Sequence, residues 1–299
     1  MPDAPRASIA GWRDRVEQGS QFEASMVVDG AMGVAKTALG VGRAAVTDPA
    51  GSVMAGSEFV SSAGRVLAPA PEPMSPVMTQ RSLREWFAEL SYDLSDLKAA
   101  AKGAGGTLND AFMAAVIGGL RNYHAAHGGI PEELRVNMPV NMRSAAEATE
   151  AGGNKWVPVR LPLPLNEADP VLRIRQLHPI LAQARNEPAL TISDPVYKVL
   201  MTLPRAITTR IAGGLMKGTD FAATNVPGPP FPVFIAGARV NRLIPFAPKS
   251  GASLNIGLMS YNGRAEIGIN IDREAVPDVE FLLECFDNSF KEILATVDA

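Results

Sequence analysis

The longest stretch of apolar positions in the chain covers residues 111–120, where no residue is polar. A helix that is apolar on every side is buried between other elements instead of lying at a surface. Thr107 and Asp110 have the spacing of a capping box, and Gly128-Gly129 follows the last apolar turn. The pattern therefore predicts one central buried helix over residues 107–127, around which the folded chain is organised.

Alternating apolar and polar positions predict the strands. They cover residues 86–92, 134–140, 221–226, 233–235, 239–243, 254–261 and 266–271. Residues 156–165 are also extended but contain prolines, which cannot donate to a ladder, so we expect an edge or crossover strand there. Asn262-Gly263, between the last two strands, is a strong hairpin signal.

Helical spacing predicts further helices at 96–104, 170–185 and 279–297, with Ser95 as the cap of the first. Asp194-Pro195 and Pro204 open two more. Helices interleaved with strands, followed by a terminal hairpin and helix, predict the α/β (α+β) class. We expect a mixed β-sheet with helices on one face.

Residues 1–74 differ in composition from the rest of the chain. Residues 27–46 and 51–67 are rich in Ala, Gly and Val, and Pro69, Pro71, Pro73 and Pro76 follow. Gly lowers helix propensity and small side chains bury little area, so the two helices predicted here need a surface to pack on. We predict a helical connector with a proline-rich linker at 1–74 and a folded domain at 75–299.

Charge and cysteine content narrow the class of protein. The formal net charge is −3, and no basic stripe marks a nucleic-acid surface, so we expect no nucleic-acid partner. The single cysteine, Cys285, excludes an intramolecular disulfide framework, fits a reducing cytosol and has the apolar neighbours of a buried thiol. The N-terminal residues do not read as a signal peptide, and residues 111–120 are too few to span a bilayer. A cytoplasmic location is expected.

Few residues offer catalytic or metal-binding chemistry. His124 and His127 lie three positions apart at the end of the central helix, where they could cap the helix or hold a metal. No third ligand stands at a matching spacing, so we expect no metal, and His178 is interpreted as a boundary residue. The sequence contains no GxxxxGK[ST], GxGxxG or GxSxG motif. The residues by themselves therefore show no self-contained catalytic set.

Asn109 and Asp110 in the first turn of the central helix allow two interpretations. In one, Asp110 completes the cap and Asn109 bonds a neighbouring loop. In the other, the pair forms the floor of an active-site channel. The physical pattern alone favours the cap.

Five ordered stretches resemble the C-terminal half of the bacterial wax ester synthase/diacylglycerol acyltransferase family, within the CoA-dependent acyltransferases. They are Ser75-Pro76-Val77-Met78, residues 106–123 with Asn109-Asp110, residues 138–143 followed by Gly152-Gly153-Asn154, Thr224-Asn225-Val226-Pro227-Gly228-Pro229, and residues 254–263 with Gly268 and Asp272. The resemblance covers roughly residues 75–295. It implies the C-terminal lobe of a two-lobed protein with a fold like that of chloramphenicol acetyltransferase.

The resemblance also implies a catalytic motif that this sequence lacks. In the family, the second His of HHxxxDG in the N-terminal lobe is the general base, and no HHxxxDG occurs here. Val28-Asp29-Gly30 retains a DG, with Ala24 and Ser25 at the histidine positions. Either residues 1–74 correspond to the segment after the motif, which we favour, or residues 24–30 are the decayed motif itself. In both cases the base is missing, and we assign no catalytic residue.

The resemblance implies that the chain supplies the second wall of a channel for acyl-CoA and a lipid alcohol. The candidate residues of this channel or of the lobe interface are Asn109, Asp110, Arg143, Asn154, Asn225, Pro227 and Gly228. Acyl-CoA is expected as a substrate, with diacylglycerol or a long-chain alcohol as acceptor and no cofactor. The expected partner is an HHxxxDG-bearing lobe or a second copy of the chain, with peripheral association at a membrane or lipid droplet. The alternative is a non-catalytic acyl-CoA-binding or regulatory protein derived from the family.

Overall fold

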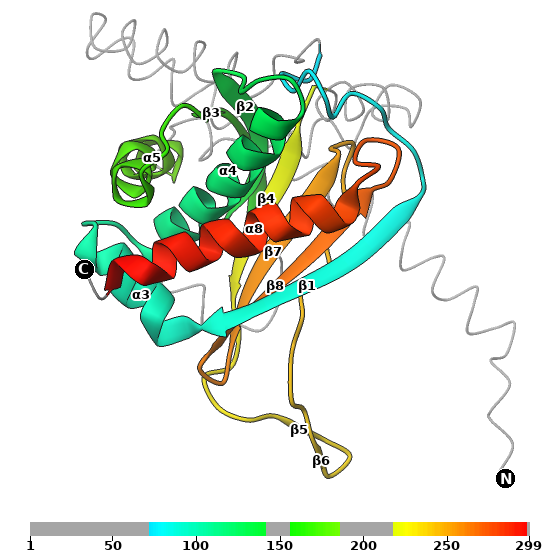
Figure 1. Cartoon of the computed structure of the whole chain (residues 1–299). Coiled ribbons are helices and arrows are strands. Elements are labelled where there is room, and N and C mark those ends of the chain that lie inside the picture. Colours follow the sequence, from blue (N-terminus) through cyan, green and yellow to red (C-terminus); the bar gives the residue numbers. More distant parts are fainter. Residues whose placement is uncertain (1–71, 142–155, 186–217, 298–299) are drawn as a thin grey trace, which may run out of the picture. The chain divides into compact units, whose positions relative to one another are not determined.

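The computed structural model describes residues 72–141, 156–185 and 218–297, all of which lie in one compact unit (Figure 1). Its main sheet contains six strands: β1 (Glu85–Asp93), β2 (Glu133–Asn141), β3 (Trp156–Pro164), β4 (Phe221–Pro227), β7 (Leu254–Tyr261) and β8 (Arg264–Asp272). The helices are α3 (Leu94–Gly103), α4 (Leu108–Ala126), α5 (Pro170–Arg185) and α8 (Val279–Leu294), followed by the short helix η3 (Ala295–Val297). Two short strands, β5 (Phe234–Ile235) and β6 (Ala238–Arg239), form a separate pair.

The sheet is mixed, as predicted. Its strand order is β1-β8-β7-β4-β2-β3, in which β4 runs parallel to both β7 and β2 and the other neighbours are antiparallel. The proline-containing strand β3 is an edge strand, which confirms the prediction made from its prolines. Asn262 and Gly263 form the predicted β7–β8 turn with φ values of 45° and 85°.

Helices α4 and α8 lie across one face of the sheet (Figure 1). Residues 111–120 of α4 are all buried, which confirms the prediction of a central helix. A Cβ added at Gly119 would lie 2.4 Å from Cδ1 and 3.0 Å from Cα of Phe286, so the two helices approach each other closely at this glycine. Tyr92 of β1 stacks on Phe290 of α8 with ring centroids 4.8 Å apart, which joins the sheet to the helical layer.

The segment Arg242–Lys249, here called the strap, crosses the other face of the sheet. The Gly257–Gly268 pair of β7 and β8 lies beneath it, and a Cβ added at Gly268 would lie 1.9 Å from the carbonyl oxygen of Pro245. Arg242 binds the buried Glu266 of β8 through Nε at 3.0 Å and Nη2 at 2.7 Å. The prediction of a strand at 239–243 is therefore wrong beyond Arg239, because the chain leaves the β5–β6 pair to cross the glycines.

Helix α3 begins one residue after Asp93, not after Ser95. The Asp93 carboxylate accepts hydrogen bonds from the backbone N–H groups of Ser95 and Asp96, and Ser95 lies inside the first turn. Asp93 is the stronger cap because its position at the end of β1 aims the carboxylate at those groups. The helices predicted within 1–74, and those predicted to begin near Asp194 and Pro204, lie outside the described residues.

Candidate functional site

The start of α4 carries a buried carboxylate with three donors. Asp110 is 1% exposed, and its Oδ2 accepts hydrogen bonds from the backbone N–H of Thr107 at 2.7 Å, from Thr107 Oγ1 at 2.8 Å and from His178 Nδ1 at 2.7 Å. The capping box predicted from the sequence is thus confirmed. The prediction of His178 as a simple boundary residue misses this contact, because no local pattern indicates that this residue of α5 reaches the cap of α4.

The imidazole of His178 is held by a carboxylate on one side and partly open to solvent on the other. Its side chain is 44% exposed, whereas that of Asp110 is 2% exposed. Because Nδ1 donates to a carboxylate, the neutral ring leaves Nε2 as its acceptor. Asn109, beside Asp110 in the first turn, is partly exposed.

The other candidates lie on different elements. Asn225 and Pro227 are among the last three residues of β4. Gly228 follows, and its backbone N–H donates to Ser260 Oγ at 3.2 Å. A Cβ at Gly228 would lie 2.3 Å from the Ser260 carbonyl oxygen, so only glycine fits this close approach. Arg143 and Asn154 lie outside the described residues. The role of all seven candidates as channel or interface residues stays a prediction.

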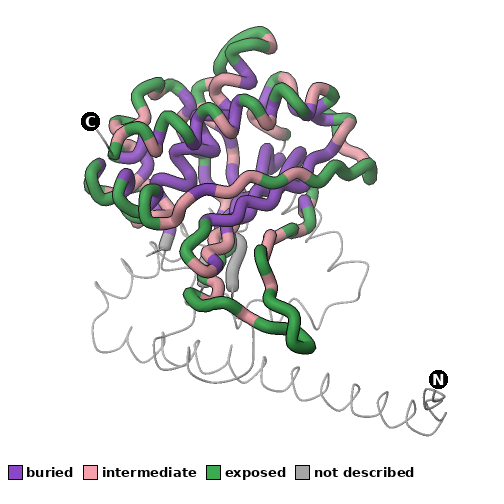
Figure 2. The backbone as a smooth tube through the Cα atoms, turned by 60° about the horizontal axis from the view of Figure 1, so that its bottom comes forward, coloured by how far each residue is buried: buried purple, intermediate pink, exposed green. Residues whose placement is uncertain are grey.

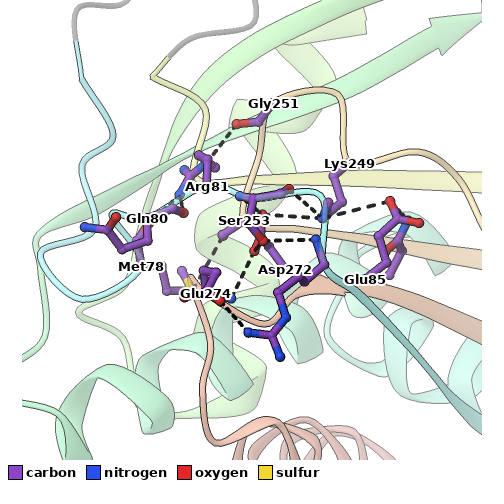
Figure 3. A network of polar contacts seen from close by, with 12 residues as sticks. Met78, Gln80, Arg81, Glu85, Lys249, Gly251, Ser253, Asp272 and Glu274 are labelled. Carbon is purple, nitrogen blue, oxygen red and sulfur yellow. Dashed lines mark hydrogen bonds and ion pairs between the residues drawn. The ribbon is translucent and has the colours of Figure 1, made fainter.

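A second polar cluster ties the segment before β1 to the end of β8 (Figure 3). Asp272 is 1% exposed and accepts from Ser82 Oγ at 2.6 Å and from the backbone N–H of Glu274 at 3.0 Å, while Lys249 Nζ lies 3.4 Å away. Burial opposes ionisation of Asp272, but these donors outweigh it and hold its pKa below the ordinary value. This carboxylate is therefore a structural anchor that is already fully engaged by its neighbours.

The segment before β1 is held by a buried clasp, defined here as Ser75, His124 and Asp220. The backbone N–H of Ser75 donates to Asp220 Oδ1 at 2.8 Å, and Ser75 Oγ lies 2.8 Å from His124 Nε2. His124 Nδ1 donates to the Leu120 carbonyl at 2.7 Å, so Nε2 of the neutral ring accepts the Ser75 hydroxyl proton. Sequence reasoning missed this clasp because its members are separated by up to 145 residues.

The clasp resembles a serine–histidine pair in geometry but is sealed from substrate. Ser75 is 2% exposed, and His124 and Asp220 are 0% exposed. Burial lowers the pKa of His124 and raises that of Asp220, in the second case against the backbone hydrogen bonds that favour the carboxylate. An imidazole without access to solvent cannot serve as a base for an acceptor alcohol.

The remaining histidine of α4 and the single cysteine also have structural surroundings. His127 donates from Nδ1 to the Tyr123 carbonyl at 2.8 Å and its Nε2 lies 2.7 Å from Asp278, so it does not share a ligand site with His124. Among the described residues, no group of three or more His, Cys, Asp or Glu is placed to hold a metal ion. Cys285 is buried as predicted, and burial raises the pKa of its thiol to about 11.

Comparison with solved structures identifies the fold. A wax ester synthase/diacylglycerol acyltransferase from Marinobacter aquaeolei VT8 is similar with a TM-score of 0.56 and 20% identity, over 82% of this chain and 57% of that chain. The cyclization-docking bidomain of EpoB from Sorangium cellulosum is similar with a TM-score of 0.54 and 14% identity, over 79% of this chain and 48% of that chain. The fold is therefore that of the acyltransferase lobes which these enzymes share with condensation domains.

Sequence comparison identifies the family. Residues 152–294 match the family model of the WS/DGAT C-terminal domain. A putative diacylglycerol O-acyltransferase of Mycobacterium tuberculosis is 35% identical over 294 residues, which are 98% of this chain and 59% of that protein. A probable diacylglycerol O-acyltransferase of the same species is 28% identical over 254 residues, or 82% of this chain and 54% of that protein.

These matches confirm the resemblance inferred from the motifs. The chain carries a C-terminal domain of the wax ester synthase/diacylglycerol acyltransferase family. It spans little more than half the length of the curated relatives it matches. Within the described ranges, no helix combines the length and the apolar character needed to cross a membrane.

Proposed function

We propose that this chain is the second wall of an acyl-CoA-dependent O-acyltransferase site and acts together with an HHxxxDG-bearing lobe. The observation that carries the proposal is a WS/DGAT C-terminal domain in a sequence that has no HHxxxDG motif. The acceptor is diacylglycerol or a long-chain alcohol, and acyl-CoA is the donor. The base would lie on that lobe, in the same or another polypeptide.

The reaction needs a base that this chain does not supply. The acceptor hydroxyl gives its proton to a histidine while its oxygen attacks the thioester carbonyl, and the CoA thiolate leaves and takes up a proton. A histidine suits this task because its pKa lies near the working pH. Of the three histidines here, His124 is sealed, His127 is paired with Asp278, and His178 is tied to Asp110 at the cap of α4.

The proposed contribution of the chain is to position the substrates. Asn109 lies partly exposed beside the rigid cap of Asp110, and Asn225 lies near the end of the parallel strand β4. Each offers an amide that can donate to a carbonyl and accept from a hydroxyl. Because the acceptor is a lipid, we expect the assembled enzyme to work in the cytoplasm at the surface of a membrane or lipid droplet.

The first test measures thiol release from a long-chain acyl-CoA in the presence of diacylglycerol or a fatty alcohol. The chain is assayed alone and with a separately purified HHxxxDG-bearing lobe of the family. Activity is expected only in the mixture, and Asn109→Ala should lower kcat/KM by roughly tenfold or more without loss of assembly. The matched control is Asn288→Ala, which removes an exposed amide from the surface of α8.

Other outcomes have definite meanings. Activity of the chain alone that is lost in His178→Gln would place the base on the Asp110-bound imidazole and contradict the need for a partner lobe. Acyl-CoA binding without turnover in either sample would support the alternative function, a non-catalytic acyl-CoA-binding or regulatory protein. The buried Cys285 should contribute little background to thiol detection.

A further inference from the structure

Strand β1 is an edge strand of the main sheet. Among the described residues its only neighbour in the sheet is β8, and the register with β8 runs from Glu85 to Asp93 without a bulge. Figure 2 shows exposed and intermediate colours along most of β1, whereas β8 beside it is almost entirely buried. The opposite edge strand, β3, contains three prolines that oppose further pairing, and β1 contains none. A long edge strand without such protection is open to pairing with another strand.

The hydrogen bonds to β8 decide which backbone groups of β1 point away from the sheet. The N–H of Arg273 donates to the Arg84 carbonyl at 3.1 Å, and the N–H of Leu94 donates to the Gly263 carbonyl at 3.0 Å. Both bonds continue the β1–β8 register, so the even-numbered residues of β1 bond to β8. The N–H and C=O groups that point outward therefore belong to Glu85, Phe87, Glu89 and Ser91.

These outward groups are self-complementary about Ala88. In an antiparallel pair of copies with Ala88 opposite Ala88, Glu85 of one protomer faces Ser91 of the other. Phe87 likewise faces Glu89. Each outward N–H and C=O of these residues then has a partner across the pair. Because the sheet continues from one protomer into the other, the pairing covers the β1 edge of both.

Charge selects this register over its neighbours. Sliding the copies by two residues places Glu89 opposite Glu89 in one direction and Glu85 opposite Glu89 in the other, and like charges directly opposite each other are unfavourable. With Ala88 at the centre, Glu85 instead meets Ser91, whose hydroxyl accepts from Nε and Nη2 of Arg264 at 3.2 and 3.0 Å. The exposed Arg264 guanidinium therefore stands beside the incoming carboxylate.

Apolar contacts add to the backbone pairing on the face that carries the helices. Trp86 is 37% exposed, and Leu90 is partly exposed. With Ala88 at the centre, Trp86 of each protomer faces Leu90 of the other, and cross-strand contacts of this kind stabilise a sheet. The Arg273 guanidinium lies 4.7 Å from the centroid of the Trp86 ring, which orders the ring before pairing.

We propose that the chain forms a symmetric homodimer in which two β1 strands pair antiparallel about Ala88. The pairing joins two six-stranded sheets into one continuous sheet. A second copy is the partner that fits, because one register of β1 on itself matches the backbone groups, the charges and the apolar side chains together. The dimer is independent of the proposed acyl transfer, since it uses only the edge of the sheet.

Disulfide formation in the full chain tests the register. Across the proposed pair, Ala88 faces itself at a position without hydrogen bonds between protomers, where facing Cα atoms are about 4.5 Å apart and a disulfide can form. Ala88→Cys should therefore give a covalent dimer with oxidised glutathione. The unchanged chain should give none, because Cys285 is buried and burial raises the pKa of its thiol to about 11.

Two further cysteine variants separate this register from chance collisions. Trp86→Cys and Leu90→Cys should each cross-link far less than Ala88→Cys when oxidised alone. A mixture of the two should form the mixed disulfide, because residues 86 and 90 face each other across the pair.

Sedimentation equilibrium under reducing conditions measures the association without a cross-link. The mass of the unchanged chain should rise from monomer to dimer with concentration. Ala88→Glu should raise the dissociation constant at least roughly tenfold, because it places two carboxylates opposite each other. Ala238→Glu adds the same charge at an exposed alanine of β6 and should associate like the unchanged chain. Phe87→Pro, which removes one outward N–H and leaves the bonds to β8, is the second probe where Ala88→Glu lowers Tm.

Three results would overturn the proposal. They are a monomer mass at every concentration, equal association of the unchanged chain and the two β1 variants, and cross-linking of Ala88→Cys no greater than that of Trp86→Cys alone. Cross-linking of Leu90→Cys alone, with none in the mixture with Trp86→Cys, would also contradict it, because the strands would then pair in another register.

Discussion

At the scale of single residues, Asp110 serves two elements at once. Its carboxylate completes the cap of α4 and also binds His178 of α5, so one buried side chain joins two helices. A buried carboxylate needs such donors because desolvation without them is costly. The cap interpretation of Asp110 is confirmed, and the channel interpretation stays a prediction.

We predict that Asp110→Ala lowers the free energy of unfolding by about 2–3 kcal/mol, because it removes the cap and leaves His178 without its acceptor. His178→Ala should cost about 1 kcal/mol, since its ring is partly exposed. Urea denaturation measures both. Asp169→Ala is the control, because Asp169 is an exposed cap of α5 and should cost about 1 kcal/mol. An effect of Asp110→Ala no larger than this control would contradict the double role.

The clasp predicts a pH dependence of stability. Burial lowers the pKa of His124 in the folded state, so below about pH 6.5 the unfolded chain binds a proton that the folded chain refuses. Stability should therefore fall by about 1–2 kcal/mol between pH 7 and pH 5. Asp220 is linked to His124 through Ser75, and its pKa is raised in the folded state. At still lower pH the folded chain therefore binds a proton there more readily than the unfolded chain, which offsets part of the loss of stability.

Thermal unfolding of His124→Gln across the same pH range checks this expectation. The variant should lose the slope between pH 7 and pH 5 while His127→Gln retains it, because His127 lies outside the clasp. A slope that is the same in all three chains would assign the acid sensitivity to other groups.

At the scale of elements, the strap depends on two glycines that face each other across β7 and β8. We predict that Gly268→Ala lowers the free energy of unfolding by about 3 kcal/mol or more, because the added Cβ would overlap the backbone of Pro245. Gly257→Ala should be milder, since its Cβ would lie 3.3 Å from Pro245 Cγ. Denaturant titration is the measurement. Gly103→Ala, which meets open space at the end of α3, should be neutral or slightly stabilising.

The same elements show what the sequence could reveal. Periodicity and turn signals located α4, α8 and the β7–β8 hairpin, because each depends on residues close together in the chain. The strand predicted at 239–243 extends two residues into the strap, because residues 239–243 are locally extended and the glycines beneath the strap lie far along the sequence. For the same reason, the contact of His178 with Asp110, 68 residues away, left no local signal.

At the scale of the whole molecule, the described residues form a lobe with two unlike faces. One face carries helices, and the other carries the strap, which follows the β5–β6 pair in the chain. Motifs in fixed order identified the family, whereas the three histidines and one cysteine gave no catalytic set. The strands of the β5–β6 pair were predicted, but the exposure of Phe234 and Ile235 was not, because the exposure of an apolar side chain depends on packing elsewhere in the fold.

The pairing of the first described strand with the last has a consequence for synthesis on the ribosome. Ser82, just before β1, binds Asp272 at the end of β8, and 190 residues separate them. At roughly 5–20 residues per second, translation of that interval takes about 10–40 s. Throughout this time the nascent β1 has no partner in the sheet, so its unpaired edge is open to chaperones and to other chains. The domain therefore completes its fold only after β8 has been translated.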